Sequence, residues 1–310
     1  MHKRTIKIGT RGSQLALWQA REVEKELQIA HPHIETEIVV IKTKGDIILD
    51  VALSKIGDKG LFTKEIELAL LNGDIHMAVH SLKDMPTELP KDLMLAGVLK
   101  RGEVRDVFIS RDGKPLSEFT PNDKIATSSL RRQAQLLHYN PAFNIVDIRG
   151  NVNSRIEKMN NGHCDALIMA GAGITRLGLE HLITHYLEPD IMMPAVSQGA
   201  VTIEIREGDE EVYQLVDSIN HLPTWYQVMA ERAFLRTMEG GCQVPVACYS
   251  EFIDDKIKMN AMVASLDGKE IISDVMEADS QEAAEKAIMM AFSMLDAGAD
   301  KIMESIRSDE

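Results

Sequence analysis

The stretch Thr5-Ile6-Lys7-Ile8-Gly9-Thr10-Arg11-Gly12-Ser13-Gln14-Leu15-Ala16 contains the pattern from which the fold class is predicted. Residues 5–9 are typical of a strand, and Ser13 is suited to cap the N-terminus of a helix. Strand and helix patterns of this kind alternate as far as about residue 170. Such alternation predicts α/β domains built on parallel sheets with helices on both faces.

The last third of the chain has a different pattern, which begins after Pro223. A helix over about residues 225–238 precedes three β-rich runs, and a final helix starts at about Ser280. The β-rich runs are residues 244–252, 256–265 and 270–276. This order predicts a small α+β unit at the C-terminal end. A chain of 310 residues is long enough for two or three domains.

Charge and composition exclude several classes of protein. The 34 basic and 48 acidic residues give a net charge of −14, which disfavours nucleic acid as a partner. No stretch approaches the ~18 consecutive apolar residues of a membrane span, so no membrane partner is expected. The N-terminal sequence reaches Arg11 before an apolar segment forms, and three cysteines leave one unpaired. These features predict a cytoplasmic protein.

Basic residues recur where predicted strands end and helices begin. Ligands bind at that edge of α/β sheets, because helix N-termini present free N–H groups there. The residues are Arg11, Lys83, Arg131, Arg132, Arg149, Arg155 and Arg176. A single arginine in such a place is usually solvated, but a series of them in an acidic chain predicts a cleft for several carboxylates or phosphates.

Two further motifs resemble cofactor sites without completing them. Gly171-Ala172-Gly173-Ile174-Thr175-Arg176 has an arginine where the dinucleotide fingerprint needs its third glycine. His181 and His185 have the spacing of a zinc helix, but Leu182 replaces the catalytic glutamate, so we interpret them as residues of a surface helix. No metal is therefore expected. The glycine-punctuated segment over about residues 43–60 is either a solvated connection or a lid over a bound anion.

Five motifs together resemble one known family. They are Gly9-Thr10-Arg11-Gly12-Ser13-Gln14-Leu15-Ala16, Ala78-Val79-His80-Ser81-Leu82-Lys83-Asp84-Met85-Pro86, Thr127-Ser128-Ser129-Leu130-Arg131-Arg132, Arg149-Gly150-Asn151-Val152 and Gly240-Gly241-Cys242-Gln243-Val244-Pro245. On these motifs the chain is similar to the porphobilinogen deaminases, also called hydroxymethylbilane synthases. The likeness extends from about residue 4 to beyond residue 280.

The resemblance implies three domains. Residues 1–99 and 200–217 would form domain 1, residues 100–199 domain 2, and residues 218–310 domain 3. The first two would be α/β lobes similar to those of type II periplasmic binding proteins. The third would be a three-stranded antiparallel sheet covered by helices. The resemblance further implies a monomer.

The resemblance also implies a transferase of tetrapyrrole (haem) biosynthesis. Such an enzyme joins four porphobilinogens head to tail on a dipyrromethane cofactor, which Cys242 would carry through a thioether. It releases ammonia at each step and finally adds water to free hydroxymethylbilane. Asp84 and Lys83 would be catalytic, with the carboxylate stabilising the cation formed as ammonia leaves. From the residues alone, Asp84 is first interpreted as a turn residue or an ion-pair partner of Lys83. A cysteine is most often a small buried hydrophobe, as expected for Cys164 and Cys248, but Cys242 follows Gly240-Gly241 in a loop that could present its sulfur to a cleft.

The motifs assign further residues to binding. Those implied for the cofactor are Cys242, Ser81, Lys83, Thr127, Ser129, Arg131, Arg132, Arg149, Gly150 and Arg155. Those implied for substrate are Arg11, Ser13, Arg149, Arg155, Ala170, Arg176 and Gln198.

The chain departs from the family pattern in one segment, around Gln198. Ser197 stands where glycine is usual, and Thr202 and Ile205 replace the frequent glycine and cysteine. A side chain at 197 would restrict the backbone there. Two other classes of protein stay open beside the enzyme: an anion- or solute-binding protein, and the ligand-sensing domain of a regulator. An inactive homologue is a further alternative, and activity on porphobilinogen distinguishes all three.

Overall fold

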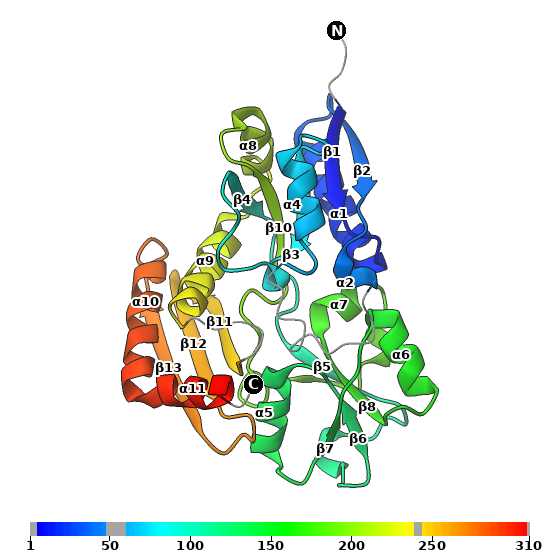
Figure 1. Cartoon of the computed structure of the whole chain (residues 1–310), viewed down its shortest axis with the longest axis vertical. Helices are drawn as coiled ribbons and strands as arrows, with labels where there is room; N and C mark the ends of the chain where they lie inside the picture. The colour runs from blue at the N-terminus through cyan, green and yellow to red at the C-terminus, as the bar shows by residue number, and fades with distance from the viewer. Residues whose placement is uncertain (1–4, 48–59, 239–243, 309–310) are drawn as a thin grey trace. The chain divides into compact units, whose positions relative to one another are not determined.

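The first sheet of the protein combines four strands from the N-terminal part of the chain with one strand that comes much later in the sequence. The computed structural model describes residues 5–47, 60–238 and 244–308. The first sheet has five strands in the order β2 (Glu35–Val40), β1 (Thr5–Thr10), β3 (Met77–Ser81), β10 (Val201–Arg206) and β4 (Leu93–Val98) (Figure 1). About 100 residues separate β10 from its neighbours β3 and β4 in the sequence.

A second five-stranded sheet is formed by the residues between β4 and β10. Its order is β7 (Asn144–Val146), β6 (Lys124–Ala126), β8 (Ala166–Ala170), β5 (Asp106–Ser110) and β9 (His185–Leu187). The two sheets have the same plan. In each, the fourth strand is the one that the chain forms directly after it leaves the other sheet: β10 follows the strands of the second sheet, and β5 follows β4 of the first.

Each sheet is mixed, which corrects the prediction of parallel sheets. Strand β1 runs parallel to β2 and β3, and β6 runs parallel to β7 and β8, as expected. However, β10 is antiparallel to β3 and β4, and β5 is antiparallel to β8 and β9. A βαβ unit forces its strands to be parallel. Strands β10 and β5 have no such helical crossover, so their direction is not constrained in that way.

Helices cover both faces of the first sheet. Ala20, Val23 and Leu27 of α1 (Gln14–Ala30) share a core with Ile6, and α8 (Glu210–Asp217) joins the same core. Helix α4 (Lys64–Leu71) packs into a separate core around Ala78. Because neighbouring residues of β3 point to opposite faces, α4 lies on the other side of the sheet from α1 and α8.

The second sheet is covered in the same manner. Helix α5 (Leu130–Tyr139) joins the core around Phe108, whereas α6 (Val152–Asn160) and α7 (Gly171–Arg176) join the core around Val107. Helix α9 (Leu222–Thr237) then leads to the last part of the chain.

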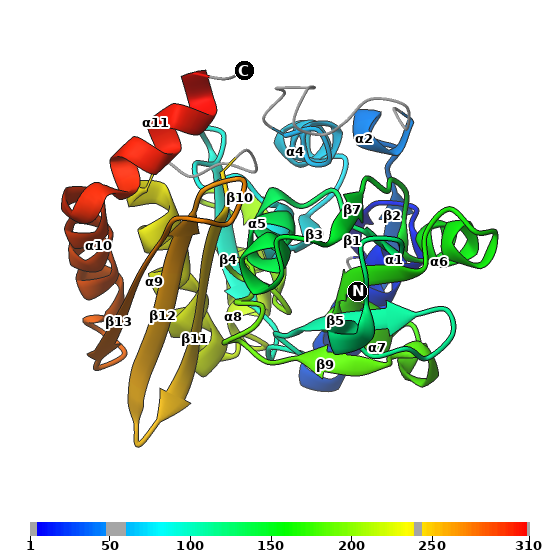
Figure 2. The same ribbon diagram turned by 90° about the horizontal axis from the view of Figure 1, so that it is seen from below.

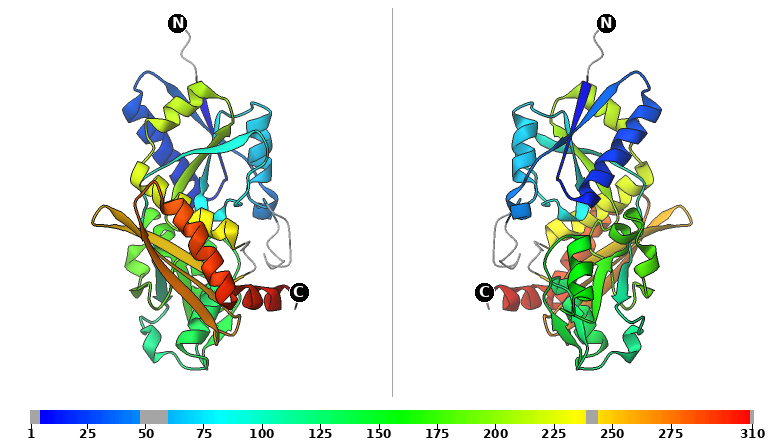
Figure 3. Two further views of the ribbon diagram at one scale, coloured as in Figure 1. Left: turned by 90° about the vertical axis from the view of Figure 1, so that its left-hand side faces the viewer. Right: turned by 90° about the vertical axis from the view of Figure 1, so that its right-hand side faces the viewer.

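The C-terminal part is the predicted α+β unit. Strands β11 (Val246–Ile253), β12 (Lys256–Ala264) and β13 (Ile271–Ala278) form an antiparallel sheet, and α10 (Ala283–Met294) packs on it (Figures 2 and 3). Helix α11 (Asp300–Ser308) follows. The fold class, two α/β sheets and a small antiparallel α+β unit, is thus confirmed.

Contacts divide the chain into two compact units. The first contains residues 1–102 and 199–225, and the second contains residues 103–198 and 226–310. The second unit holds both the second α/β sheet and the three-stranded sheet. The three predicted domain boundaries stay a prediction.

One local prediction was wrong. His181 lies in a 3-10 turn over Glu180–Leu182, while His185 lies on β9, so the two are not on one surface helix. Four-residue spacing therefore does not place them on one helix face, and the ring of His185 stacks on Phe108 instead.

Candidate functional site

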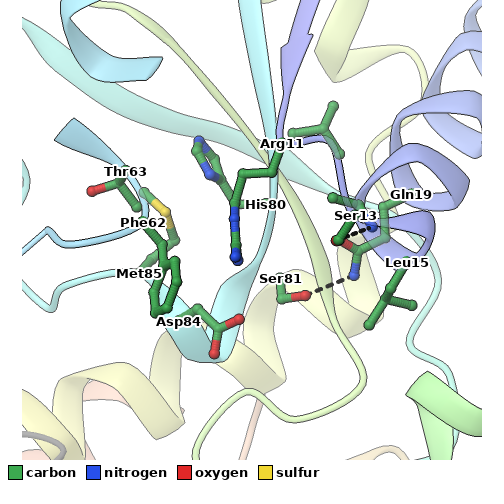
Figure 4. Close-up of a pocket in the computed structure, with 12 residues that line it drawn as sticks. Arg11, Ser13, Leu15, Gln19, Phe62, Thr63, His80, Ser81, Asp84 and Met85 are labelled. Atoms are coloured by element: carbon green, nitrogen blue, oxygen red, sulfur yellow. Dashed lines mark hydrogen bonds between the residues drawn. The ribbon is translucent and has the colours of Figure 1, made fainter. Parts of the chain in front are cut away.

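A pocket opens in the first unit where β1 and β3 end. Ser13 caps α1 by accepting a hydrogen bond from the Ala16 N–H at 3.2 Å. This cap fixes the point at which the loop that carries Arg11 joins the helix. The lining residues include Arg11, Ser13, Gln19, Phe62, Ser81 and Asp84 (Figure 4). Three predicted substrate or catalytic residues, Arg11, Ser13 and Asp84, therefore share one pocket.

Arg11 is held on two sides in this pocket. Its guanidinium lies over the Phe62 ring, 4.1 Å from the ring centroid, and pairs with Asp46 at 2.6 Å. Burial opposes ionisation of Asp46, but hydrogen bonds from Arg11 and Thr43 outweigh it and lower the pKa of that carboxyl. The arginine is thus kept in one place while part of it still faces the pocket.

Asp84 is the exposed acid of the pocket. It ends a 3-10 turn, Leu82–Asp84, which directly follows β3. The buried side chains of Leu82 and Met85 anchor this turn, so the carboxylate between them is directed outward. Within the described part of the chain, the Asp84 carboxylate has no hydrogen-bond partner. Beside it, the Ser81 hydroxyl accepts a hydrogen bond from Gln19 at 2.7 Å.

The second unit holds the paired arginines at the start of α5. Arg131 and Arg132 approach different oxygens of Asp106. Nη2 of Arg131 lies 2.7 Å from Oδ2, and Nη2 of Arg132 lies 2.7 Å from Oδ1. Gln198 donates to the same carboxylate at 3.0 Å. Burial opposes ionisation of Asp106, but the two guanidinium charges outweigh it and hold its pKa at about 2. This buried cluster fixes both arginines.

Arg149 and Arg155 lie where β7 leads into α6. Nη1 of Arg149 is buried and has no hydrogen-bond partner among the described residues. Nε of Arg155 donates a hydrogen bond to the Gly150 carbonyl at 2.8 Å, which ties this side chain to the loop before α6. Gly150 has φ 118°, and a Cβ at this position would meet the Ser154 hydroxyl, so glycine is required.

Hydroxyl groups complete this part of the second unit. The Thr127 side chain is buried, and its oxygen accepts from the Ser129 N–H at 3.3 Å. Ala170 and Arg176 border α7, with Arg176 as the last helical residue rather than at the helix start, where basic residues were expected. Most of the predicted binding residues of the second unit thus lie near the N-termini of α5, α6 and α7, whereas Arg176 lies at the C-terminal end of α7.

The donor set fits a ligand with several carboxylates. Guanidinium groups bind carboxylates through paired N–H donors, and a buried guanidinium nitrogen without a partner is costly unless a ligand supplies an acceptor. Nη1 of Arg149 is such a nitrogen. Cys242, the predicted attachment residue, and residues 48–59 of the predicted lid lie outside the described residues.

Several residues of the site were missed by the sequence reasoning. Asp46, Phe62 and Asp106 fix the arginines, and His80 lines the pocket next to Ser81. A buried aspartate at the start of a predicted strand, as at Asp106, was the one available signal, because such a charge needs a partner. Gln198 was expected to contact substrate, and in the structure its amide bonds to Asp106 and to the Val104 carbonyl.

The first unit thus offers a pocket with an exposed acid, and the second unit offers a set of arginines suited to carboxylates, which is the chemistry of a protein that binds small anionic molecules. In the described residues, no helix is long and apolar enough to cross a membrane. No group of three or more His, Cys, Asp or Glu side chains within the described ranges is arranged to hold a metal ion.

Comparison with known proteins identifies the family. Residues 6–214 match the porphobilinogen deaminase, dipyrromethane cofactor binding domain model, and residues 225–296 match the C-terminal domain model. The chain is 46% identical to the porphobilinogen deaminase of Desulforamulus reducens over 308 residues, covering 99% of this chain and 100% of the relative. It is 48% identical to that of Syntrophomonas wolfei over 300 residues, covering 97% and 98%. The chain belongs to the porphobilinogen deaminase family.

The family membership confirms the predicted enzyme class and cofactor. Porphobilinogen deaminases are hydroxymethylbilane synthases, transferases of tetrapyrrole biosynthesis, and they carry a dipyrromethane cofactor. Among solved structures, the chain is similar to the periplasmic VFT2 domain of Bordetella pertussis BvgS, with a TM-score of 0.41 at 13% identity over 69% of this chain and 86% of that one. It is also similar to the aliphatic sulphonate binding protein SsuA from Escherichia coli, with a TM-score of 0.42 at 14% identity over 76% and 70%.

Proposed function

We propose that Asp84 is the acid that carries the condensation of porphobilinogen in this chain. The observation that supports this is an exposed carboxylate, without a hydrogen-bond partner in the described residues, in the pocket that also holds Arg11. The two acids that hold the site arginines, Asp46 and Asp106, are each engaged by those arginines. Asp84 is therefore the acid that is available to substrate.

The chemistry of porphobilinogen suits this pocket. As ammonia leaves the aminomethyl group, positive charge develops on the pyrrole. The Asp84 carboxylate would accept a hydrogen bond from the pyrrole N–H and stabilise that charge. Arg11, and Arg176 of the second unit, would bind acetate and propionate groups of substrate through their guanidinium groups.

The second unit would hold the dipyrromethane. Arg131, Arg132, Arg149 and Arg155 would bind its carboxylates, with Thr127 and Ser129 as further hydrogen-bond donors. We propose Cys242 as the attachment residue. When bound, the dipyrromethane supplies the pyrrole α-carbon to which the first substrate unit is joined.

Turnover by two Asp84 variants tests the proposed acid. Asp84→Asn keeps the shape of the side chain and removes its charge, so kcat falls at least about 100-fold while the attached cofactor stays. Asp84→Glu keeps the charge and retains more activity than the amide. Asp74→Asn, which alters another exposed aspartate of the same unit, is the control and keeps wild-type turnover. Near-normal kcat in Asp84→Asn would refute the assignment.

Intact mass tests the cofactor attachment. The purified protein should exceed its sequence mass by two porphobilinogen units less two ammonia, and Cys242→Ser should lose the excess. Cys248→Ser is the matched control, because Cys248 is a buried cysteine of β11. An excess that persists in Cys242→Ser would place the tether elsewhere.

We further propose that the enzyme works as a monomer in the cytoplasm, with porphobilinogen as its partner and without nucleic acid. Within the described residues, neither Cys164 nor Cys248 forms a disulfide, as is usual for a protein of a reducing compartment. Light scattering of the purified protein should give a mass near 34.5 kDa. A dimer mass would contradict the monomer.

A further inference from the structure

Three titratable side chains form a buried cluster in the wall of the Asp84 pocket. Glu67 of α4 and His80 of β3 are each 6% exposed, and Glu204 of β10 is fully buried. The proposed reaction, as derived from Asp84, makes no use of them. His80 itself lines the pocket that contains Asp84 (Figure 4).

The geometry of the cluster is that of a histidine oriented by a carboxylate. Nε2 of His80 lies 3.1 Å from Oε2 of Glu204, and the other oxygen of Glu204 has no hydrogen-bond partner in the part of the chain that the structure describes. A fully buried carboxylate is strongly destabilised unless a neighbour donates to it. Nε2 must therefore carry the hydrogen that bonds Glu204, which leaves Nδ1 of the neutral ring as a proton acceptor.

Carboxylates surround His80 in this cluster. Glu67 of α4 interacts electrostatically with Glu204, His80 and Glu65. Burial, and then the charge of Glu204, raise the pKa of Glu67, which stabilises its neutral form. The hydrogen bond to Glu204 leaves Nδ1 of His80 as a place beside the pocket that can accept a proton.

The condensation requires such a place. In each cycle the C–N bond of substrate breaks, and its electron pair leaves with ammonia. The pyrrole α-carbon forms the new C–C bond and loses its proton when its C–H bond breaks. That proton must reach ammonia to give ammonium, while Asp84 is occupied by pyrrole N–H groups.

We propose that His80, oriented by Glu204, takes the proton released from the pyrrole α-carbon in each condensation and returns it to the departing ammonia. Transfer is direct or through one water molecule, as is usual for general bases. The inference rests on the proposed function and adds a second proton-transfer residue to it. Glu204 is a positioning residue, because it acts through His80.

The first test replaces His80 by glutamine. His80→Gln can still donate a hydrogen bond to Glu204 but cannot take up a proton. We expect kcat to fall at least about tenfold, with KM changed less than about threefold and cofactor mass unchanged. Thr202→Val is the control, because it removes a buried hydrogen bond from β10, the strand of Glu204, to the Gly97 carbonyl without altering charge. It should keep wild-type kcat.

A second variant provides a readout that a purely structural role would not change. Glu204→Gln removes the charge that favours protonated His80. The acid limb of the kcat–pH profile, where His80 must be deprotonated to act, should therefore move to lower pH. This result also supports the inference if His80→Gln does not fold.

Two results would overturn the inference. One is wild-type kcat in folded, cofactor-loaded His80→Gln. The other is an acid limb at the same pH in Glu204→Gln. In either case an active wild-type enzyme would leave the role of Asp84 intact, whereas a wild-type protein that is inactive on porphobilinogen would refute the proposed function itself.

Discussion

Arg11 with Asp46 in the first unit, and Arg131 and Arg132 with Asp106 in the second, are the same chemical pairing at very different burial. The side chains of Arg11 and Asp46 are 24% and 28% exposed, whereas those of Arg131, Arg132 and Asp106 are 6%, 7% and 0% exposed. The first pair can exchange with solvent and ligand. In the second, one carboxylate serves two cations, so the arginines are part of the protein interior as well as of the site. Burial, rather than residue type, decides which of these cations is also structural.

The largest expected effect comes from breaking the buried cluster. Asp106→Asn leaves two buried guanidinium groups with a single amide between them. We expect a loss of about 3–5 kcal/mol in the free energy of unfolding. Asp46→Asn, the matched change in the exposed pair, should cost about 0–1 kcal/mol. Urea unfolding of both variants measures the difference, and equal losses would mean that burial does not separate the two pairs.

The contribution of Asp106 can also be measured in the wild-type protein, by lowering the pH until this carboxylate becomes protonated. The pKa of Asp106 is about 2 in the folded protein, below its ordinary 3.8. Its contribution is therefore complete above about pH 4 and is lost as the pH falls toward 2. At 1.36 kcal/mol per pKa unit this contribution is roughly 2–3 kcal/mol.

The measurement is stability against pH, in the wild type and in Asp106→Asn. The wild type should lose stability more steeply between about pH 4 and 2, because the variant lacks this carboxyl. Parallel curves for the two proteins would contradict the assigned pKa.

Arg149 sharpens the comparison, because it is a predicted site arginine whose Nη1 has no partner within residues 5–47, 60–238 and 244–308. Arg149→Leu should leave thermal stability nearly unchanged and weaken binding of a carboxylate-rich ligand by about 10–100-fold. Arg131→Leu should weaken binding and also destabilise the protein, because it breaks the pair with Asp106. Melting temperature and cofactor loading after addition of porphobilinogen separate the two effects. Equal destabilisation by both variants would show that Arg149 is structural too.

The smallest effect is expected next to Gln198, the third donor to Asp106. Ser197 has φ 62°, in the left-handed region, and its buried hydroxyl has no hydrogen-bond partner in the described ranges. Ser197→Gly should therefore stabilise the protein by about 0.5–1 kcal/mol. Ser197→Ala removes the hydroxyl but keeps the backbone strain, so its gain should be smaller. Chemical unfolding measures both, and a greater gain in the alanine variant would assign the effect to the hydroxyl.

Local patterns allowed much of the fold to be predicted. Ser13 caps α1 as expected, and the three C-terminal strands lie within two residues of their predicted bounds. The direction of β5 and β10 could not be predicted from local pattern, because antiparallel insertion is decided by a partner far along the chain.

The site shows the same limit. Motifs placed Arg131, Arg132 and Asp84 among the functional residues, but periodicity does not say that Asp106 pairs with both arginines. Likewise, His80 and Glu204 are separated by 124 residues in the sequence and meet only through the pairing of β3 with β10. Such contacts arise from sheet topology, which neither residue specifies alone.

The position of β10 has a consequence for how the protein is made. A ribosome that has synthesised the first four strands of the first sheet has not yet produced β10, which lies between β3 and β4 and ends at Arg206. Until two thirds of the chain has emerged, β3 has one open edge and β4 has no neighbour in its sheet. Open strand edges favour pairing between chains. The nascent protein therefore depends on the intervening α/β segment folding quickly enough to deliver β10, and slow translation through residues 103–198 is the stage at which aggregation is favoured.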